Sequence, residues 1–158
     1  MRMLRAQWAC IWGGNLPINL EDKDFSWNIL RKNKSWDREQ KLSSIRRAIV
    51  KRNAEQDVWG WKYPRIDNYF DDIFLDIVNP MLVCVFRDPV ASSWRGVVRQ
   101  QRLPAQAIHE TLKLQANNLR IIEKSGAPTL LISYEKAIAN PLQLVKMLNQ
   151  FMSLGMLD

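Results

Sequence analysis

The sequence is poor in the residues that most often form metal and redox centres. Its 158 residues include two cysteines, Cys10 and Cys84, and a single histidine, His109. Neither cysteine stands in a spacing typical of a zinc site or a dithiol pair, so both are interpreted as buried free thiols, which suits a reducing compartment. We therefore expect no metal cofactor, and we expect a structural or surface role for His109.

The sequence also lacks a long hydrophobic run. No apolar stretch approaches the roughly 18 residues that span a bilayer, so a membrane-spanning helix is not expected. The apolar part of "MRMLRAQWACIWGG" is interrupted by Arg5 and Gln7, which makes it too short for a signal peptide and favours an amphipathic helix over residues 2–12, ended by Gly13 and Gly14. A cytoplasmic location is expected, although an exported or Golgi-like compartment of a longer parent chain stays open.

What the sequence does have is apolar content and positive charge. Its residues are 47% hydrophobic, and 23 lysines and arginines against 16 acidic residues give a net charge of +7. This length and composition predict one domain over residues 1–158 with a core of its own. The charge favours an anionic partner, such as a nucleotide, a nucleic acid, a sulfated glycan or an anionic lipid surface. No ribonucleoprotein, zinc-finger or basic-zipper signature is present, so specific nucleic-acid recognition is not expected.

Helical and strand patterns alternate along the chain. Leu42, Ile45 and Ile49 recur at helical spacing in a helix that Ser35 would cap. Three strands are expected, over 58–63, over 81–86 with both faces buried, and over 129–133. Four further helices are expected, over 66–77 with Asp67 as its cap, from Pro89, from Pro104 to Gly126, and from Pro141. The apolar face of the helix from Pro104 comprises Ile108, Leu112, Leu119 and Ile122, and that of the helix from Pro141 comprises Leu144, Val145, Leu148, Phe151 and Met152. This alternation predicts an α/β fold with a largely parallel sheet flanked by helices.

Three of the expected strands end in residues that suit an anionic ligand. The first ends at Lys62, the second at Arg87, and the third at Tyr134 and Glu135. The carboxyl ends of parallel strands meet at one edge of a sheet, which is where ligands bind in open α/β sheets. Two cations and a hydrogen-bonding aromatic ring at this edge suit a phosphate or sulfate group. The alternative is that Arg87 and Lys62 only pair with nearby carboxylates such as Asp88 and Asp67.

These segments carry a resemblance to a known family. "WGWKYPR", "VFRDPVASSW" and "LLISYEKAIANPLQLVKMLNQFMSLG" resemble, in order and in spacing, the lysine strand end, the 3′-phosphate-binding strand and helix, and the later helical segment of sulfotransferases. The similarity covers roughly residues 55 to 155. "LRAQWACIWGGNLPINLEDKDFSWN" is similar to the helix and loop that follow the phosphosulfate-binding loop of that family.

The resemblance implies a fold like that of P-loop nucleoside triphosphatases and a donor, 3′-phosphoadenosine 5′-phosphosulfate, whose sulfuryl group passes to a hydroxyl or amine of a small-molecule or glycan acceptor. Under this resemblance Arg87 would hold the 3′-phosphate, with Ser93 or Ser92 adding a hydroxyl, and Tyr134 would face the adenine. The catalytic residues would be Lys62, near the sulfuryl group, and Arg65, beside the acceptor pocket.

The sequence departs from the family pattern in three places. Ser92 and Ser93 stand closer to Arg87 than the family's serine does, and Tyr63 and Pro64 follow Lys62 where cytosolic members place a histidine base. No glycine-rich loop with a basic residue and hydroxyls is present. We therefore expect an N-terminally truncated sulfotransferase domain, incomplete at the first strand, that transfers sulfate poorly or not at all.

Loss of the first strand would leave its neighbours to pair with each other or with another chain, which allows an oligomer through unpaired sheet edges. Two other functions stay open. One is a non-catalytic nucleotide-binding relic, and the other is a basic nucleic-acid-associated α/β protein.

Overall fold

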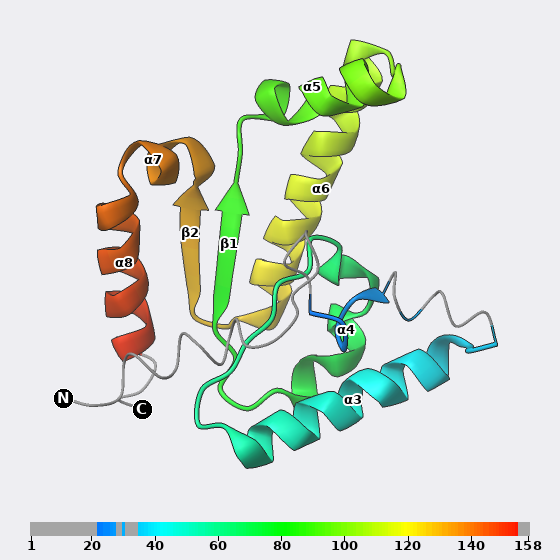
Figure 1. Ribbon diagram of the computed structural model, residues 1–158, viewed down its shortest axis with the longest axis vertical. Coiled ribbons are helices and arrows are strands. Elements are labelled where there is room, and N and C mark those ends of the chain that lie inside the picture. The colour runs from blue at the N-terminus through cyan, green and yellow to red at the C-terminus, as the bar shows by residue number, and fades with distance from the viewer. Residues whose placement is uncertain (1–21, 28–29, 31–34, 155–158) are drawn as a thin grey trace. The chain divides into compact units, whose positions relative to one another are not determined.

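The computed structural model describes residues 22–27, 30 and 35–154. The chain divides into two compact units, Met1–Val78 and Asn79–Asp158, and each is described by itself. Figure 1 shows the elements of both. The helix expected over residues 2–12, its cysteine and its glycine pair lie outside the described residues.

The first unit is built on one long helix, α3 (Arg38–Glu55). Leu42, Ile45 and Ile49 are buried on one side of it, as their spacing predicts. Ser35 is not its cap. Asp37 is the N-cap, because its carboxylate accepts the Gln40 N–H while the Gln40 side chain accepts the Asp37 N–H. This reciprocal capping box satisfies two N–H groups that the first turn leaves open.

The strand expected over residues 58–63 does not form. Residue 58 lies in a bend and residues 59–63 have no regular secondary structure, so Lys62 does not end a strand of the described sheet. Their aromatic side chains pack instead: the ring centroids of Trp59 and Trp61 are 5.6 Å apart, and that of Phe25 is 4.5 Å from Trp61. A high strand propensity reflects side chains that fit a half-buried surface, and an aromatic cluster provides such a surface without a ladder.

Residues 66–77 form three short pieces rather than one helix. They are a 3₁₀ turn η1 (Ile66–Asn68), α4 (Phe70–Ile73) and a second 3₁₀ turn η2 (Phe74–Asp76). Asp67 lies inside η1, whose N-cap is Arg65, so it is not the residue before the helix that was expected. Two arginines of α3 hold this segment, since Arg38 pairs with Asp72 and Arg46 pairs with Asp76 at 3.1 Å. The apolar spacing therefore identified the buried face correctly, while the continuous helix was wrong.

The second unit contains a parallel pair of strands, β1 (Leu82–Phe86) and β2 (Thr129–Ser133). Both were expected, and among the described residues they form the whole sheet. They hydrogen-bond directly to each other, with Leu82 opposite Thr129 and Phe86 opposite Ser133. The prediction that β1 is buried on both faces is wrong: Val83 and Val85 are exposed and only the alternate residues are half-buried. Cys84 is one of these half-buried residues and is a free thiol, and burial raises its pKa.

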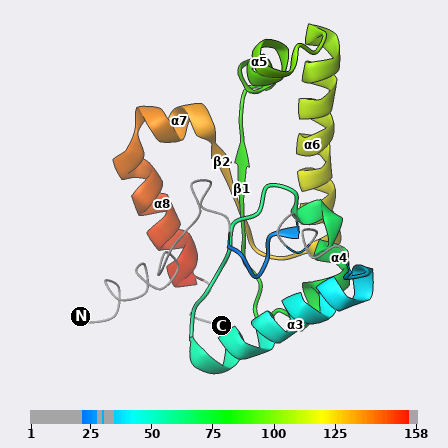
Figure 2. The same cartoon turned by 45° about the vertical axis from the view of Figure 1, so that its right-hand side comes forward.

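Helices flank the strand pair on both sides. The helix α6 (Pro104–Ser125) lies beside β1, while α7 (Tyr134–Ala139) and α8 (Pro141–Leu154) lie on the β2 side, as Figures 1 and 2 agree. In the sequence, α5 (Pro89–Gln100) follows β1 and precedes α6, and it packs against α6. Pro89, Pro104 and Pro141 each open a helix, as their positions predict.

The buried faces of α6 and α8 differ in detail from the predicted ones. Ala107 and Ile121 are the buried residues of α6, whereas Leu112 and Leu119 are exposed. On α8 Val145 is exposed, although Leu144 and Leu148 are half-buried. His109 is exposed on α6, which agrees with the surface role expected for it. Gly126 ends α6 in a left-handed conformation with φ 61°, as its position after the apolar pattern predicts.

The described part of the chain is therefore mixed α/β, mostly helical, with a two-stranded parallel sheet between helices. None of its helices combines the length and the apolar character that a bilayer crossing requires.

The buried face of α3 offers a direct test of what holds the first unit together. Ile45 has 0% of its surface exposed, whereas Val50, on the same helix, is 67% exposed. We expect Ile45→Ala to lower the free energy of unfolding by about 2–5 kcal/mol, because it removes buried methyl groups and leaves a cavity. Val50→Ala is the matched control and should change it by less than about 0.5 kcal/mol. Urea unfolding followed by circular dichroism measures both, and equal effects would contradict the assigned core.

Candidate functional site

The candidate site lies in the second unit, at the carboxyl edge of the strand pair. Both strands point the same way in Figure 1, so β1 delivers Arg87 and β2 delivers Tyr134 to the same edge. The guanidinium carbon of Arg87 lies 4.6 Å from the centroid of the Tyr134 ring. This is a cation–π contact, and it aligns the planar guanidinium beside the aromatic ring. The two residues that strand-end reasoning singled out in this unit are thus in contact.

Arg87 does not pair with the carboxylate next to it. Asp88 is the N-cap of α5, and its Oδ1 accepts the Ala91 N–H at 2.8 Å. Arg87 is exposed and, within the described ranges, forms no ion pair. Its backbone carbonyl accepts a hydrogen bond from Nε2 of Gln115 on α6, at 2.5 Å. The backbone of Arg87 is therefore anchored, and its exposed guanidinium carries five N–H donors that could bind a ligand.

Glu135 ties the two strand ends together. Its Oε1 accepts the backbone N–H of Asp88 at 3.0 Å, and its Oε2 accepts the hydroxyl of Ser133 at 3.4 Å. The N–H of Asp88 and, after it, the backbone N–H of Glu135 itself lower the pKa of the Glu135 carboxyl below its ordinary value. The bridge spans residues 47 positions apart in sequence. Glu135 thus clamps the turn after β1 to the start of α7.

The charges at this edge nearly balance. Arg87 and the exposed Lys136 of α7 stand against the carboxylates of Asp88 and Glu135. The helix α5 offers little to an anion at its first turn, because Asp88 already accepts the Ala91 N–H. An anionic group would therefore be held by direct contact with the Arg87 guanidinium rather than by a general positive potential.

The two serines on α5 differ in their surroundings. Ser93 is buried, and its hydroxyl donates to the carbonyl of Val90 in its own helix at 2.8 Å. Ser92 is partly exposed, and its backbone N–H donates to the Asp88 carbonyl at 2.9 Å. Of the two, Ser92 has the more accessible hydroxyl, so it is the better candidate for a second ligand contact.

Lys62 and Arg65 belong to the first unit. Both are exposed, and Arg65 pairs with Asp67 at 3.6 Å. Asp67 is the carboxylate that the spacing suggested as a partner for Lys62. The predicted residues that the structure brings together are Arg87 and Tyr134, with both serines on the helix that follows Arg87.

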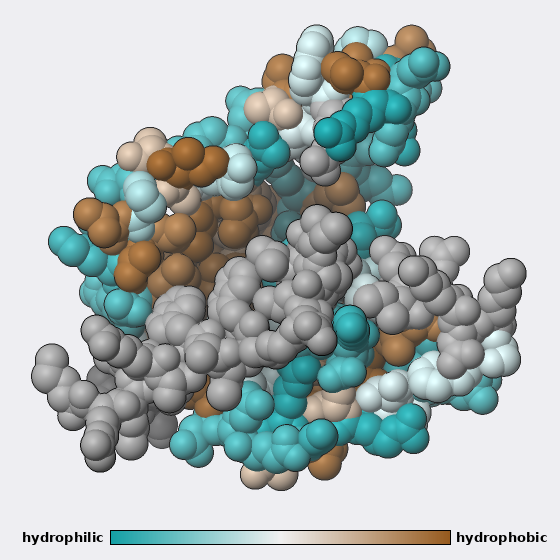
Figure 3. All heavy atoms as spheres, in the orientation of Figure 1, coloured by the Kyte–Doolittle hydropathy of each residue, from teal (hydrophilic) through white to brown (hydrophobic). Residues whose placement is uncertain are grey.

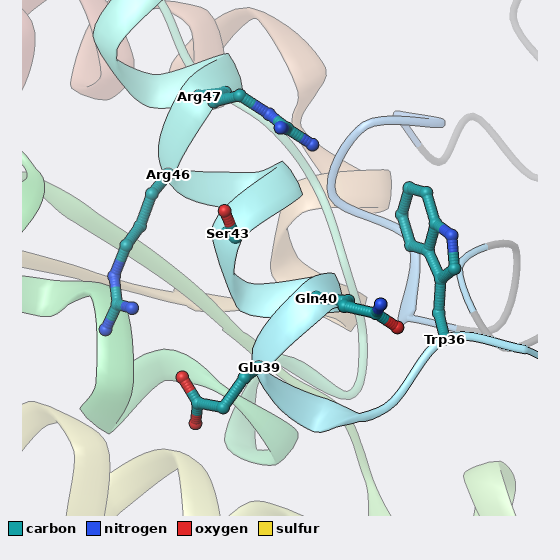
Figure 4. A pocket seen from close by; sticks show the side chains of 6 residues that line it. All are labelled: Trp36, Glu39, Gln40, Ser43, Arg46 and Arg47. Atoms are coloured by element: carbon teal, nitrogen blue, oxygen red, sulfur yellow. The ribbon is translucent and has the colours of Figure 1, made fainter.

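A shallow pocket runs along the outer side of α3. Its described lining is Trp36, Glu39, Gln40, Ser43, Arg46 and Arg47. Figure 4 shows Gln40 pointing toward Trp36, with Arg46 on the opposite side of the helix, where it pairs with Asp76. None of the predicted site residues is among these six. In the described ranges no cluster of histidine, cysteine and carboxylate side chains could hold a metal ion.

Two residues that shape the edge were given no role from the sequence: Glu135, which was placed at the end of the third strand, and Gln115, which was missed. Glu135 directly follows a residue that was identified, and a carboxylate in the first turn of a helix is a recognisable signal. Gln115 carried no signal, because it lies mid-helix and 28 positions from the carbonyl that it contacts. Comparison with protein-family models, curated proteins and solved structures finds no match to this chain.

The Glu135 bridge predicts a pH response. A pKa lowered in the folded chain means that the bridge stabilises the fold above the ordinary pKa of 4.5, and that this contribution is lost as the pH falls through the lower folded value. We expect the amide signal of Asp88 in an NMR titration to move with a midpoint below 4.5. Glu135→Gln keeps the shape of the side chain and should remove that component. An unchanged titration in Glu135→Gln would contradict the bridge.

Proposed function

We propose that the second unit binds a 3′-phosphoadenosine nucleotide at the carboxyl edge of β1 and β2, as part of a sulfotransferase-type protein. The observation that supports this most directly is the Arg87 guanidinium, exposed and without an ion pair in the described part of the chain, 4.6 Å from the Tyr134 ring. The resemblance of the surrounding segments to sulfotransferases supplies the identity of the nucleotide.

The chemistry of each half of the ligand matches one of these side chains. A planar guanidinium forms two parallel, charge-assisted hydrogen bonds with a phosphate, which a lysine ammonium does not reproduce. The Tyr134 ring offers an aromatic surface for the adenine, and the partly exposed Ser92 offers a hydroxyl from the helix that begins beside Arg87. The ligand would be recognised by its 3′-phosphate and its base.

The sulfuryl end of the donor requires further groups. In the transfer the bond between the sulfuryl sulfur and the bridging phosphate oxygen breaks, a bond from sulfur to an acceptor oxygen or nitrogen forms, and the acceptor loses its proton. Lys62 is the proposed cation for the charge on the leaving and equatorial oxygens, and Arg65 the proposed acceptor-side residue. The sequence contains no glycine-rich loop to hold the 5′-phosphosulfate, so we expect weak transfer by this chain alone.

The Arg87 contact can be tested by ligand-dependent thermal stability. We expect 3′-phosphoadenosine 5′-phosphate to raise the melting temperature more than adenosine 5′-monophosphate does, because only the former carries the 3′-phosphate. Arg87→Ala should abolish that difference and weaken binding about tenfold to a hundredfold, as expected for the loss of a charge-assisted pair.

The matched control is Arg99→Ala, which removes another exposed arginine from the same unit. It should leave the difference between the two nucleotides unchanged. Equal stabilisation by both nucleotides in the unaltered chain would overturn the proposal. Binding that is lost equally in Arg87→Ala and Arg99→Ala would show a nonspecific charge effect and would also contradict it.

Lys62→Ala separates binding from transfer. We expect transfer of labelled sulfate from the donor to a panel of phenol, amine and glycan acceptors to fall about a hundredfold, since the variant lacks the cation at the reacting group. Thermal stabilisation by 3′-phosphoadenosine 5′-phosphate should persist. If the unaltered chain binds this nucleotide but gives no transfer with any acceptor, the non-catalytic binding function is favoured. If transfer by Lys62→Ala is unchanged, Lys62 has no role in the reaction.

A further inference from the structure

The helix α5 carries an apolar stripe that faces outward. Val90, Trp94 and Val98 follow one another at intervals of four residues, so they share one side of the helix. They are 64%, 66% and 57% exposed, and Leu103, just after the helix, is 65% exposed. Figure 3 shows hydrophobic side chains at the surface in the part of the view where Figure 1 draws α5. We call these four residues the α5 stripe.

The opposite side of α5 is already used for packing. Ser93 is buried there, and a Cβ added to Gly96 would lie 3.5 Å from the Cβ of Ala107 on α6. The two helices therefore approach closely through small residues. The α5 stripe is not the packing face of this hairpin, and in the described part of the chain no element covers it.

The segment that carries the stripe contains charges of one sign, although Asp88 and Glu110 stand just outside it. From Pro89 to His109 the sequence contains three arginines and no acidic residue. Arg99 is exposed and, in the described ranges, has no ion pair, whereas Arg102 pairs with Glu110. An apolar stripe with tryptophan, on a segment whose charged side chains are all arginines, is the pattern of a helix that lies in the interface of an anionic membrane. A surface that would complement such a helix offers both negatively charged headgroups and accessible hydrocarbon chains.

We propose that α5 docks on an anionic lipid surface, with Val90, Trp94, Val98 and Leu103 inserted at the boundary between headgroups and acyl chains. Arg99 contacts the phosphate or carboxylate groups of the lipids. Trp94 anchors the helix, because its ring is apolar while its indole N–H stays at the level of the headgroups. The contact is peripheral and reversible, and it is independent of the proposed nucleotide site.

Cosedimentation with lipid vesicles tests this docking. The protein is mixed at low ionic strength with vesicles of phosphatidylcholine alone and with vesicles that also contain phosphatidylserine. We expect binding only to the second kind, and weakening as salt is added, because headgroup attraction is screened. Trp94→Ser and Arg99→Glu should each weaken binding about tenfold or more.

The control is Leu75→Ser, which replaces a 94% exposed leucine that lies beside Asp76 rather than beside cations. It should bind vesicles as the unaltered chain does. The proposal is overturned if the chain fails to bind phosphatidylserine vesicles, if it binds neutral vesicles equally well, or if Trp94→Ser binds unchanged. Size-exclusion chromatography at several protein concentrations tests whether a second copy of the chain covers the stripe instead. If the chain self-associates, if Trp94→Ser abolishes this self-association and if no vesicle binding is seen, the α5 stripe is a contact between two copies of the chain.

Discussion

The direct pairing of β1 with β2 is the constraint on which the second unit depends. Since Phe86 lies opposite Ser133 in a parallel ladder, the next residues, Arg87 and Tyr134, leave the sheet side by side. The same register sets the starting points of α5 and α7, so that a carboxylate on one turn meets a backbone N–H on the other. A shift of one residue would turn every side chain of one strand to the other face and would separate the guanidinium from the ring.

A two-stranded sheet has little stability of its own, and the helices packed beside it stabilise it. An isolated pair of strands is marginal in water, so it needs helices packed beside it. Here α6 lies beside β1 and α7 beside β2, and Gln115 of α6 fixes the carbonyl at the end of β1. The exposed Val83 and Val85 mark the face of β1 that no described element covers. The strand pair is thus supported at its sides and at its carboxyl edge.

Local signals predicted much of this fold; a nonlocal requirement accounts for the missing strand, and a competing local signal accounts for the misplaced N-cap. Pro89, Pro104, Pro141 and Gly126 act within a turn of their own position, so the helix limits that they mark were predictable. A strand over residues 58–63 was not, because a strand requires a partner, and Trp59 and Trp61 satisfy their packing in an aromatic cluster with Phe25 instead. The N-cap was misplaced because Asp37 and Gln40 form a capping box that competes with Ser35.

In the candidate site, too, the residues with a local signal were predictable and those with long-range contacts were not. Arg87 and Tyr134 were found because a strand end is visible in sequence, whereas Glu135 and Gln115 act across long sequence separations. The helix α5 depends on both local and nonlocal signals. Its small residues, Ser93 and Gly96, let it approach α6 closely, and in a helix this choice of inner face fixes which residues point outward. Valines and a tryptophan at those outer positions add nothing to the packing of the hairpin, so packing within the described part of the second unit does not account for their apolar character.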